Sequence, residues 1–284
     1  MKYTILYNSL SDNKNGLDNA KAVESLLENA KSITYADWVQ LDDKISYINS
    51  LPEDETVVIC GGDGSLNHFV TELDDKKMER DIYYFPCGSG NDFARDVFDG
   101  EKKALIHLNE YINDLPKVTV KGKEYRYIDD VGFGIDGYVC EEADKLRKTT
   151  NKPINYPLIA IKGFLFRFRT KTAKVVVDGK EYTFERVVLA STFNGRFYGG
   201  GMQIAPMQDR KNKEHTQTFV CLHNCRKIKG IIVFAGVFSL KHLKYKKNVT
   251  FLTGKEIEVT FDTPSAIQLD GEVVKDVLSY KIKA

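Results

Sequence analysis

Two short segments combine glycines with one carboxylate, and each directly follows an apolar run. Gly61-Gly62-Asp63-Gly64-Ser65 follows residues 57–60, and Gly88-Ser89-Gly90-Asn91-Asp92 follows residues 83–86. In both places a strand is expected to pass into a helix, where backbone N–H groups and the helix dipole favour bound anions. We therefore expect the two segments to bind the phosphates of a nucleoside triphosphate.

The residue types in these turns suit a phosphate that is bound together with a metal ion. Phosphate approaches a backbone closely only where no Cβ intrudes, and glycine also adopts the positive φ angles that such turns need. Gly61, Gly62 and Gly64 are expected to meet both demands. Carboxylates alone would repel phosphate, so Asp63 and Asp92 imply a Mg²⁺ ion between them and the ligand. One such turn could equally be an ordinary Asp-capped turn, but two at successive strand ends favour a ligand site.

Composition limits the class of protein. The 284 residues are enough for two domains, and 41 basic against 40 acidic side chains leave a formal charge of +1. No overall field draws such a chain to nucleic acid, which we exclude as a partner, and any basic patch must be local. Five cysteines scattered through apolar stretches, with a strand in place of a signal peptide at the N-terminus, predict a cytoplasmic protein. Residues 221–225 lack the second ligand pair of a zinc site.

Residues 1–115 alternate between strand and helix patterns, which is typical of a mostly parallel sheet with crossover helices. Strands are expected at residues 3–7, 33–35, 56–60 and 82–85, and helices near residues 23–30, 45–48, 66–73, 93–98 and 105–112. Beyond residue 115, shorter alternating runs between glycines predict a β-rich, sandwich-like domain over residues 116–284. We expect its extreme C-terminal segment to pack back on the first domain.

Other nucleotide-binding signatures fit less well. The chain contains no G-x-x-x-x-G-K-[ST] segment, which excludes a P-loop. Residues 132–137 satisfy G-x-G-x-x-G, but they come after the alternating region and no acidic residue follows about twenty positions later. A tight packing turn is the interpretation that we favour there.

Residues 58–67, VICGGDGSLN, and residues 86–95, PCGSGNDFAR, together closely resemble the diacylglycerol kinase catalytic family of lipid kinases. Agreement continues in order through residues 114–115, 132–137, 198–206 and 269–272, and so spans nearly the whole chain. NAD kinases share the first block but not the second. The resemblance implies an ATP-dependent lipid kinase with an ATP-binding domain at 1–115, a lipid-substrate domain at 116–284, and an active site in the cleft between them.

The resemblance also implies roles for individual residues. Glu272 matches the family's proton acceptor, although turn chemistry alone would make it a solvated hairpin residue beside Gly271. Asp63, Asp92 and Asp114 would organise the catalytic Mg²⁺. Contacts to ATP would come from Asn8, Thr34, Gly61, Gly62, Asp63, Gly64, Ser65, Asn67, Gly88, Ser89 and Asn91.

Two departures from the family pattern affect these expectations. The opening segment Asn8-Ser9-Leu10-Ser11-Asp12 lacks the usual Pro and Gly, so the first phosphate-side loop is expected to differ. The Asp-Asp-Gly segment that often binds a second, structural magnesium reads Lys211-Asn212-Lys213. Two ammonium groups oppose a dication, so we expect that metal site to be absent.

The sequence indicates less about the substrate than about the nucleotide. We expect a lipid kinase whose first substrate is diacylglycerol. The alternatives are a kinase of the NAD kinase type, which acts on a soluble substrate, and a non-catalytic nucleotide or lipid sensor. Residues 158–169 and 231–240 are too short to cross a bilayer, and each is accompanied by basic residues. They fit peripheral contact with anionic headgroups at the inner membrane surface and, equally, buried segments with solvated lysines. A homodimer is a further expected partner arrangement.

Overall fold

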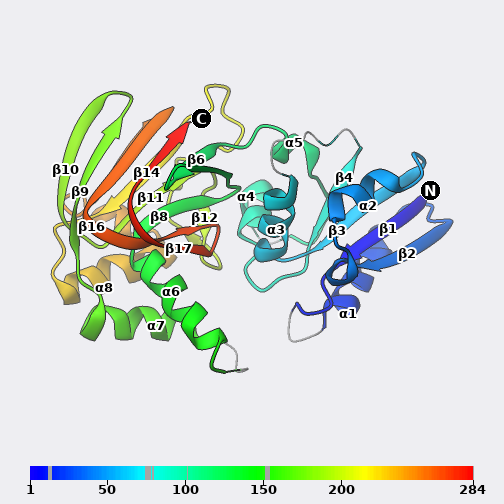
Figure 1. The fold of residues 1–284 in the computed structure, drawn as a ribbon, viewed down its shortest axis with the longest axis horizontal. Coiled ribbons are helices and arrows are strands. Elements are labelled where there is room, and N and C mark those ends of the chain that lie inside the picture. The colour runs from blue at the N-terminus through cyan, green and yellow to red at the C-terminus, as the bar shows by residue number, and fades with distance from the viewer. Residues whose placement is uncertain (12–14, 74–77, 79, 101, 151–153, 284) are drawn as a thin grey trace. The chain divides into compact units, whose positions relative to one another are not determined.

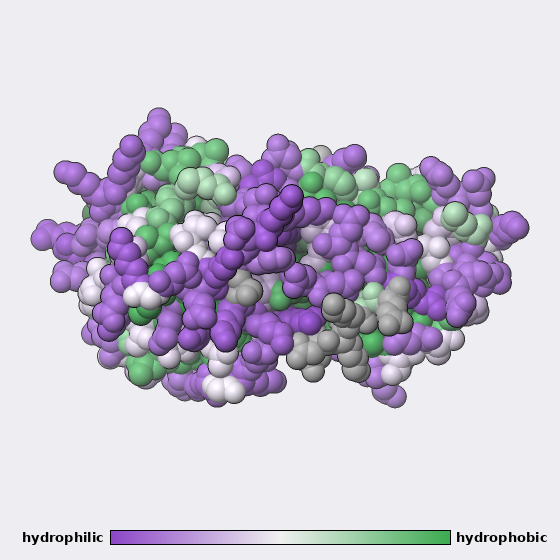
Figure 2. Space-filling view, turned by 90° about the horizontal axis from the view of Figure 1, so that it is seen from above, coloured by the Kyte–Doolittle hydropathy of each residue, from purple (hydrophilic) through white to green (hydrophobic). Residues whose placement is uncertain are grey.

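The computed structural model describes residues 1–11, 15–73, 78, 80–100, 102–150 and 154–283. The chain divides into two compact units (Figure 1): Met1–Leu115 with Gly199–Gly201, and Pro116–Tyr198 with Met202–Ala284. Hydrophilic residues predominate on the face seen in Figure 2, and apolar residues form separate patches on it. Among the described residues, no helix is both long enough and apolar enough to span a bilayer.

The first unit is built on a five-stranded sheet in the order β2-β1-β3-β4-β5. Four strands are parallel and β5 is antiparallel, which confirms a mostly parallel sheet. The strands are β1 (Lys2–Tyr7), β2 (Ser32–Asp37), β3 (Glu55–Gly61), β4 (Ile82–Pro86) and β5 (Ile106–His107). Tyr7 is in register with Cys60, and Gly61 with Pro86, so β1, β3 and β4 end at the same edge. The loops that follow these strands therefore start side by side.

The helices of the first unit follow the apolar periodicity in part. They are α1 (Gly16–Lys21), η2 (Ala22–Leu26), η3 (Trp38–Gln40), α2 (Lys44–Ser50), α3 (Asp63–Leu73), α4 (Asp92–Phe98) and α5 (Asn109–Ile112). The helices predicted around residues 45–48, 66–73 and 93–98 are confirmed. The one predicted at 105–112 is shorter, because Ile106 and His107 join the sheet and the side chain of Asn109 accepts a hydrogen bond from Ile82 N at 2.8 Å. The one predicted at 23–30 begins earlier, at Gly16, and ends at Leu26.

The second unit is an antiparallel sheet in the order β15-β14-β11-β8-β16-β17-β6-β7, with β9 paired to β16 and β10 to β9. Its strands are β6 (Lys117–Val120), β7 (Lys123–Arg126), β8 (Asp130–Gly134), β9 (Lys171–Val177), β10 (Lys180–Val187), β11 (Leu189–Phe193), β14 (Gln217–Leu222), β15 (Val249–Gly254), β16 (Glu256–Leu269) and β17 (Glu272–Lys283). The β-rich domain is confirmed. The C-terminal strand β17 pairs with β16 and β6 within the second unit.

The second unit also carries helices that the strand pattern concealed: α6 (Ile135–Arg147), α7 (Tyr156–Lys162), η4 (Gly163–Arg167), α8 (Lys227–Ala235), η5 (Gly236–Ser239) and η6 (Lys241–Lys244). Helix α6 starts inside the G-x-G-x-x-G segment. A Cβ at Gly132 would lie 1.8 Å from Ser191 Oγ, and one at Gly137 would lie 2.1 Å from Ala266 O. These glycines therefore allow β8 to lie close to Ser191 of β11 and α6 to lie close to Ala266 of β16.

Candidate active site

The two glycine turns of the first unit touch each other. A Cβ built on Gly88 would lie 2.4 Å from Gly62 Cα, and one built on Gly62 would lie 3.0 Å from Gly88 Cα. Cys87 N donates to Gly61 O at 2.9 Å, which extends the pairing of β3 and β4 into the turns. Only residues without side chains allow the two backbones to approach this closely. The turns thus form one continuous backbone surface at the edge of the sheet.

The reason for glycine in the first turn differs from the sequence-based expectation. Gly61, Gly62 and Gly64 do not have positive φ angles; in the second turn Asn91 has one, at 55°. The expectation of positive φ was wrong for these three glycines, because β3 passes directly into α3 without a left-handed residue. A Cβ on Gly61 would lie 2.3 Å from Ser65 Cβ, whereas one on Gly64 would meet no atom within 4 Å. Gly64 therefore faces open space at the first turn of α3, where an anion is favoured.

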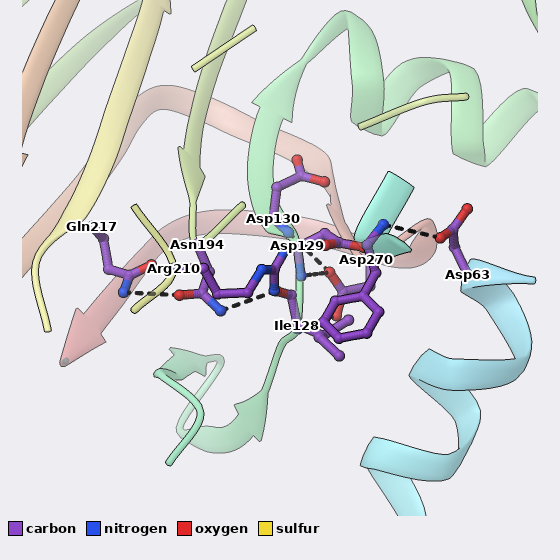
Figure 3. A network of polar contacts seen from close by, with 9 residues as sticks. Asp63, Ile128, Asp129, Asp130, Asn194, Arg210, Gln217 and Asp270 are labelled. Atoms are coloured by element: carbon purple, nitrogen blue, oxygen red, sulfur yellow. Dashed lines mark hydrogen bonds and ion pairs between the residues drawn. The ribbon is translucent and has the colours of Figure 1, made fainter. Parts of the chain in front are cut away.

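Asp63 is the first residue of α3 and connects the two turns. Its Oδ1 accepts a hydrogen bond from Phe93 N at 3.3 Å (Figure 3). A Cβ at Gly90 would lie 2.8 Å from Asp63 Oδ2, so glycine at position 90 leaves room for this carboxylate. Burial raises the pKa of Asp63 above its ordinary value. Asp63 is therefore held close to the start of α4 in a site that penalises its charge.

Asp92 is buried and is held by a segment distant in the sequence. Its two carboxylate oxygens accept hydrogen bonds from Gly200 N at 2.7 Å and Gly201 N at 2.6 Å. These glycines have φ angles of 87° and 103°, in the turn between β12 (Phe197–Tyr198) and β13 (Met202–Gln203). Burial, and then the neighbouring Asp63, raise the pKa of Asp92 to about 6. The glycine run was expected from the family resemblance, but its contact with Asp92 was not predicted.

The pair of carboxylates fits a magnesium ion. The repulsion from Asp63 that raises the pKa of Asp92 is what a divalent cation between them would relieve. Over the ranges that the structure describes, no three His, Cys, Asp or Glu side chains gather into a metal site, so Asp114 does not complete one with this pair. Asp114 is exposed after α5. Mg²⁺ commonly uses one or two carboxylates, and takes its other ligands from phosphates and water.

The other residues of these turns that were expected to bind nucleotide differ in whether a ligand can reach them. Ser89 is exposed at the tip of the second turn, where a ligand can reach it. The Asn91 side chain closes that turn, since it accepts from Gly88 N at 2.9 Å and donates to Gly88 O at 2.7 Å. Ser65 and Asn67 are buried on α3. These three residues shape the backbone surface from within.

Asn8 and Thr34 lie in different positions relative to the turns. Asn8 follows β1 beside the end of β3, and its Oδ1 accepts from Leu10 N at 2.9 Å. Thr34 is exposed in the middle of β2, and in register it is level with Val57, with β1 between them. The structure thus brings Asn8, but not Thr34, to the edge that carries the turns. Asp12 of the opening segment lies outside the described residues.

Glu272 stands at the tip of the β16–β17 hairpin in the second unit. Asp270 and Gly271 form the two-residue turn with φ angles of 44° and 87°, and Leu269 is paired with Glu272. Positive φ at both positions is the requirement of a type I′ turn, which favours Asp-Gly. Glu272 is exposed directly after this turn.

The turn that carries Glu272 is anchored by Asp270. Its carboxylate accepts hydrogen bonds from three successive backbone N–H groups, Ile128 at 2.6 Å, Asp129 at 2.8 Å and Asp130 at 2.9 Å. Burial raises the pKa of Asp270 to about 6, although these three donors oppose the shift. Gly271 N donates to Gln268 Oε1 at 2.8 Å and fixes the turn from its other side. The position of Glu272 is therefore set by buried groups.

A buried arginine supplies positive charge to this cluster. Figure 3 shows Arg210 and Asn194 converging on Ile128 and Asp129. Arg210 Nη2 lies 2.7 Å from Asp129 Oδ1, its Nη1 donates to Ile128 O, and Asn194 Nδ2 donates to Ile128 O at 3.0 Å. Lys211 and Lys213, which drew attention in the sequence, are exposed beside it. Arg210 was not predicted from the sequence, because a single arginine in a polar loop gives no signal of burial.

Two more buried acids, Asp130 and Asp136, lie next to this cluster. Asp130 accepts a hydrogen bond from Gln268 Nε2, and its pKa is well above the ordinary value because of burial and then of Asp136. Burial raises the pKa of Asp136 to about 7, against the hydroxyl groups of Ser191 and Tyr198, which donate to it at 3.2 and 3.3 Å. Neither acid had been singled out from the sequence.

Comparison with known proteins identifies both units. Residues 2–120 match the diacylglycerol kinase catalytic domain, and residues 129–280 match the YegS C-terminal NAD kinase beta sandwich-like domain. YtlR of Bacillus subtilis (strain 168), which carries a provisional lipid kinase name, is 26% identical over 235 residues, covering 77% of this chain and 74% of YtlR. A diacylglycerol kinase of Mycobacterium tuberculosis (strain H37Rv) is 27% identical over 168 residues, which cover 56% of this chain and 52% of that protein.

Solved structures give the same fold. A Bacillus anthracis (str. Sterne) protein described provisionally as a diacylglycerol kinase superimposes with a TM-score of 0.67 at 17% identity, covering 99% of this chain and 91% of that one. A second structure, of a diacylglycerol kinase from the same organism, gives a TM-score of 0.62, again at 17% identity, with 99% and 93% covered. With both family domains matched in order and the two-domain fold shared, the chain belongs to the diacylglycerol kinase catalytic-domain family of lipid kinases.

Proposed function

We propose that this chain transfers the γ-phosphoryl group of ATP to the hydroxyl group of diacylglycerol, forming phosphatidic acid. The observation that carries the proposal is the contact between the two glycine turns, which places Asp63 and Asp92 together beside the exposed Gly64. Family membership supports a lipid substrate, and the diacylglycerol kinase of Mycobacterium tuberculosis supports this particular lipid.

The phosphate chain would lie along the joined turns. The first turn of α3 presents backbone N–H groups at Gly62, Asp63 and Gly64, and the open space at Gly64 lets a phosphate approach. Ser89 adds an exposed hydroxyl group from the second turn. Asp63 and Asp92 would hold Mg²⁺, which when bound neutralises the charge on the phosphates.

Glu272 is proposed to accept the proton of the lipid hydroxyl. As the hydroxyl oxygen forms its bond to the γ-phosphorus, the proton passes to the Glu272 carboxylate and the bond from γ-phosphorus to the bridging oxygen of ADP breaks. Alignment of the reactants and neutralisation of charge would supply most of the acceleration. The Asp270 anchor contributes by holding the turn that carries Glu272.

The cysteines suit a cytoplasmic location for this reaction. All five are free thiols, and Cys60, Cys221 and Cys225 are buried. Free thiols without disulfides are usual in reducing compartments.

The experiment that tests the proposal is phosphoryl transfer from radiolabelled ATP to a panel of dispersed substrates. The panel contains diacylglycerol, a sphingoid base, an undecaprenol-like alcohol, phosphatidylglycerol and NAD, and each labelled product is identified by mass. We expect labelled phosphatidic acid, formed only with Mg²⁺ present. Label in NADP, or in none of the products, would refute the proposal.

A further inference from the structure

Two helical segments of the second unit expose an unusual share of large apolar side chains. Among the described residues, nine of the sixteen exposed large hydrophobic side chains lie on α7 with η4 or on α8 with η5 and the residue after it. They are Tyr156, Leu158, Ile161, Leu165, Phe166, Ile228, Ile232, Phe238 and Leu240. Phe166 and Ile228 are 77% and 72% exposed. We call this set the α7–α8 surface.

The α7–α8 surface is one continuous feature because the two segments pack on each other. The rings of Phe164 and Phe234 lie 5.8 Å apart, and Lys227 Nζ donates to Leu165 O at 3.1 Å. In Figure 1, α7 and α8 lie beside one another below the sheet of the second unit. The inner faces bury Phe164 and Val233 in the core, so the exposed residues are the outer face of an anchored layer.

Helix α8 shows the same division within a single element. Val233 points into the core, while Ile228 and Ile232, four residues apart, share the outer face and are exposed. Lys227 and Lys229 are exposed on the same helix, so its outer side combines apolar and basic side chains. The outer face therefore suits a partner that takes up both kinds of side chain.

Charge is strongly segregated in the same part of the chain. Residues 145–177 and 215–255 contain 17 of the chain's 41 Lys and Arg residues and none of its 40 Asp and Glu residues. A hollow of about 630 Å³ on α8 is lined by Arg226, Lys227, Ile228, Lys229, Ile232 and Tyr245. Its lining thus combines cationic groups with apolar side chains, the combination that an anionic lipid headgroup and the start of its acyl chain require.

We propose that the α7–α8 surface docks on an anionic phospholipid bilayer, with its apolar side chains entering the interface and its basic residues contacting headgroup phosphates. A symmetric dimer through this surface would bring the same lysines of two copies together, which like-charge repulsion disfavours. A bilayer supplies both the apolar partner and the negative charge. This docking rests on the proposed lipid kinase function, because it names the surface through which the kinase would meet the membrane that holds its substrate. Vesicle binding is measured without nucleotide and is therefore independent of phosphoryl transfer.

The test is co-sedimentation of the full chain with vesicles of phosphatidylcholine alone or of phosphatidylcholine with phosphatidylglycerol. We expect binding only to the anionic vesicles, decreasing as salt is raised. Phe166→Ser with Ile228→Ser should weaken binding by at least about tenfold, because both side chains lose apolar contact. Arg226→Gln with Lys229→Gln should weaken it by about fivefold per charge removed.

A matched control uses exposed residues of β17, Leu278→Ser with Lys283→Gln, which should bind as the wild type does. Unfolding temperatures of all variants check that the fold is kept. Absence of binding to anionic vesicles, or equal binding by the surface variants, overturns the proposal. So does a wild-type dimer that Ile228→Ser converts to a monomer. Phosphorylation of detergent-dispersed diacylglycerol, measured separately, should persist in the surface variants and so distinguishes lost docking from lost catalysis.

Discussion

Arg210 and Asp129 form an ion pair in which both side chains are only 7% exposed, with Nη2 and Oδ1 2.7 Å apart. The guanidinium also donates to Ile128 O, next to the backbone groups that hold Asp270. A Cβ at Gly195 would lie 2.2 Å from Arg210 Nη2, so glycine there leaves room for the arginine. This pair therefore supports the turn that carries Glu272.

Arg210→Gln should lower the free energy of unfolding by about 3 kcal/mol, because it leaves the buried Asp129 carboxylate without its cation. Chemical denaturation measures the change. Lys255→Gln, which breaks an exposed pair with Glu214, is the control and should change stability little, because solvent screens that pair. Equal losses in the two variants would show that Arg210 is not structurally important. Asp129→Asn combined with Arg210→Gln should lose less than the two single variants added together.

Gly88→Ala and Gly64→Ala should separate packing from ligand binding in the glycine turns. The added methyl at position 88 meets the Gly62 backbone, so we expect a loss of about 1–3 kcal/mol in stability. At position 64 it meets no protein atom, so stability should hold while the Kd for ATP, measured by calorimetry with Mg²⁺, rises. Unchanged ATP affinity in Gly64→Ala would mean that the phosphates bind elsewhere.

Asp63→Ala should abolish phosphoryl transfer and leave the protein folded. The variant removes one of the two carboxylates proposed to hold Mg²⁺, and it also lowers the pKa of Asp92 by removing a neighbouring negative charge. Turnover as a function of Mg²⁺ concentration is the measurement, with circular dichroism as the check on folding. Wild-type turnover would remove Asp63 from the mechanism.

Glu272→Gln should abolish measurable turnover, since loss of a general base typically costs about 10²- to 10⁴-fold in rate. The Kd for ATP should not change, because Glu272 lies in the second unit and not in the glycine turns. Its exposed position predicts unchanged stability. Steady-state kinetics together with ATP calorimetry check both points, and a variant with normal kcat would exclude Glu272 as the proton acceptor.

Asp136→Asn should alter the pH dependence of stability. The folded-state pKa of Asp136 is about 7, above its unfolded value near 4, so the folded state binds the extra proton between these pH values. The stability that this proton provides is present at low pH and is lost as pH rises through about 7. The variant should therefore gain stability relative to the wild type as pH rises from about 4 to 8. Thermal unfolding of both proteins across that pH range is the measurement. If the stability of the variant and of the wild type changed in parallel with pH, the raised pKa of Asp136 would be contradicted.

The sequence predicted the parts of the fold that depend on local apolar periodicity. Strands such as residues 82–85 and the helix at 66–73 follow from their own side chains, and the motif positions showed that two turns share one sheet edge. Helix α6 was missed because its glycine-containing start resembles the neighbouring strand segments. The length of β16 depends on a bulged register, between Thr260 and Ser265, that local pattern does not encode.

The site was predicted in its residues more than in its contacts. Asp63 and Asp92 were named from motif and spacing and Glu272 from the family resemblance, whereas the partners of Asp92 come from a turn 108 and 109 residues later. The buried positions of Arg210 and Asp270 were not predicted, because burial of a charged residue depends on tertiary packing. Thr34 was placed from approximate alignment alone, and strand register puts it away from the turns.

The segregated charge around α7 and α8 would also act on the protein before the proposed docking on an anionic bilayer. Outside residues 145–177 and 215–255, the chain carries 24 basic against 40 acidic side chains, so its net charge of +1 conceals a local excess of positive charge in these two segments. In the field of a negatively charged leaflet, such a molecule experiences a torque before it touches the lipid. The protein would then arrive in one preferred orientation, and unproductive collisions would become rarer as ionic strength falls.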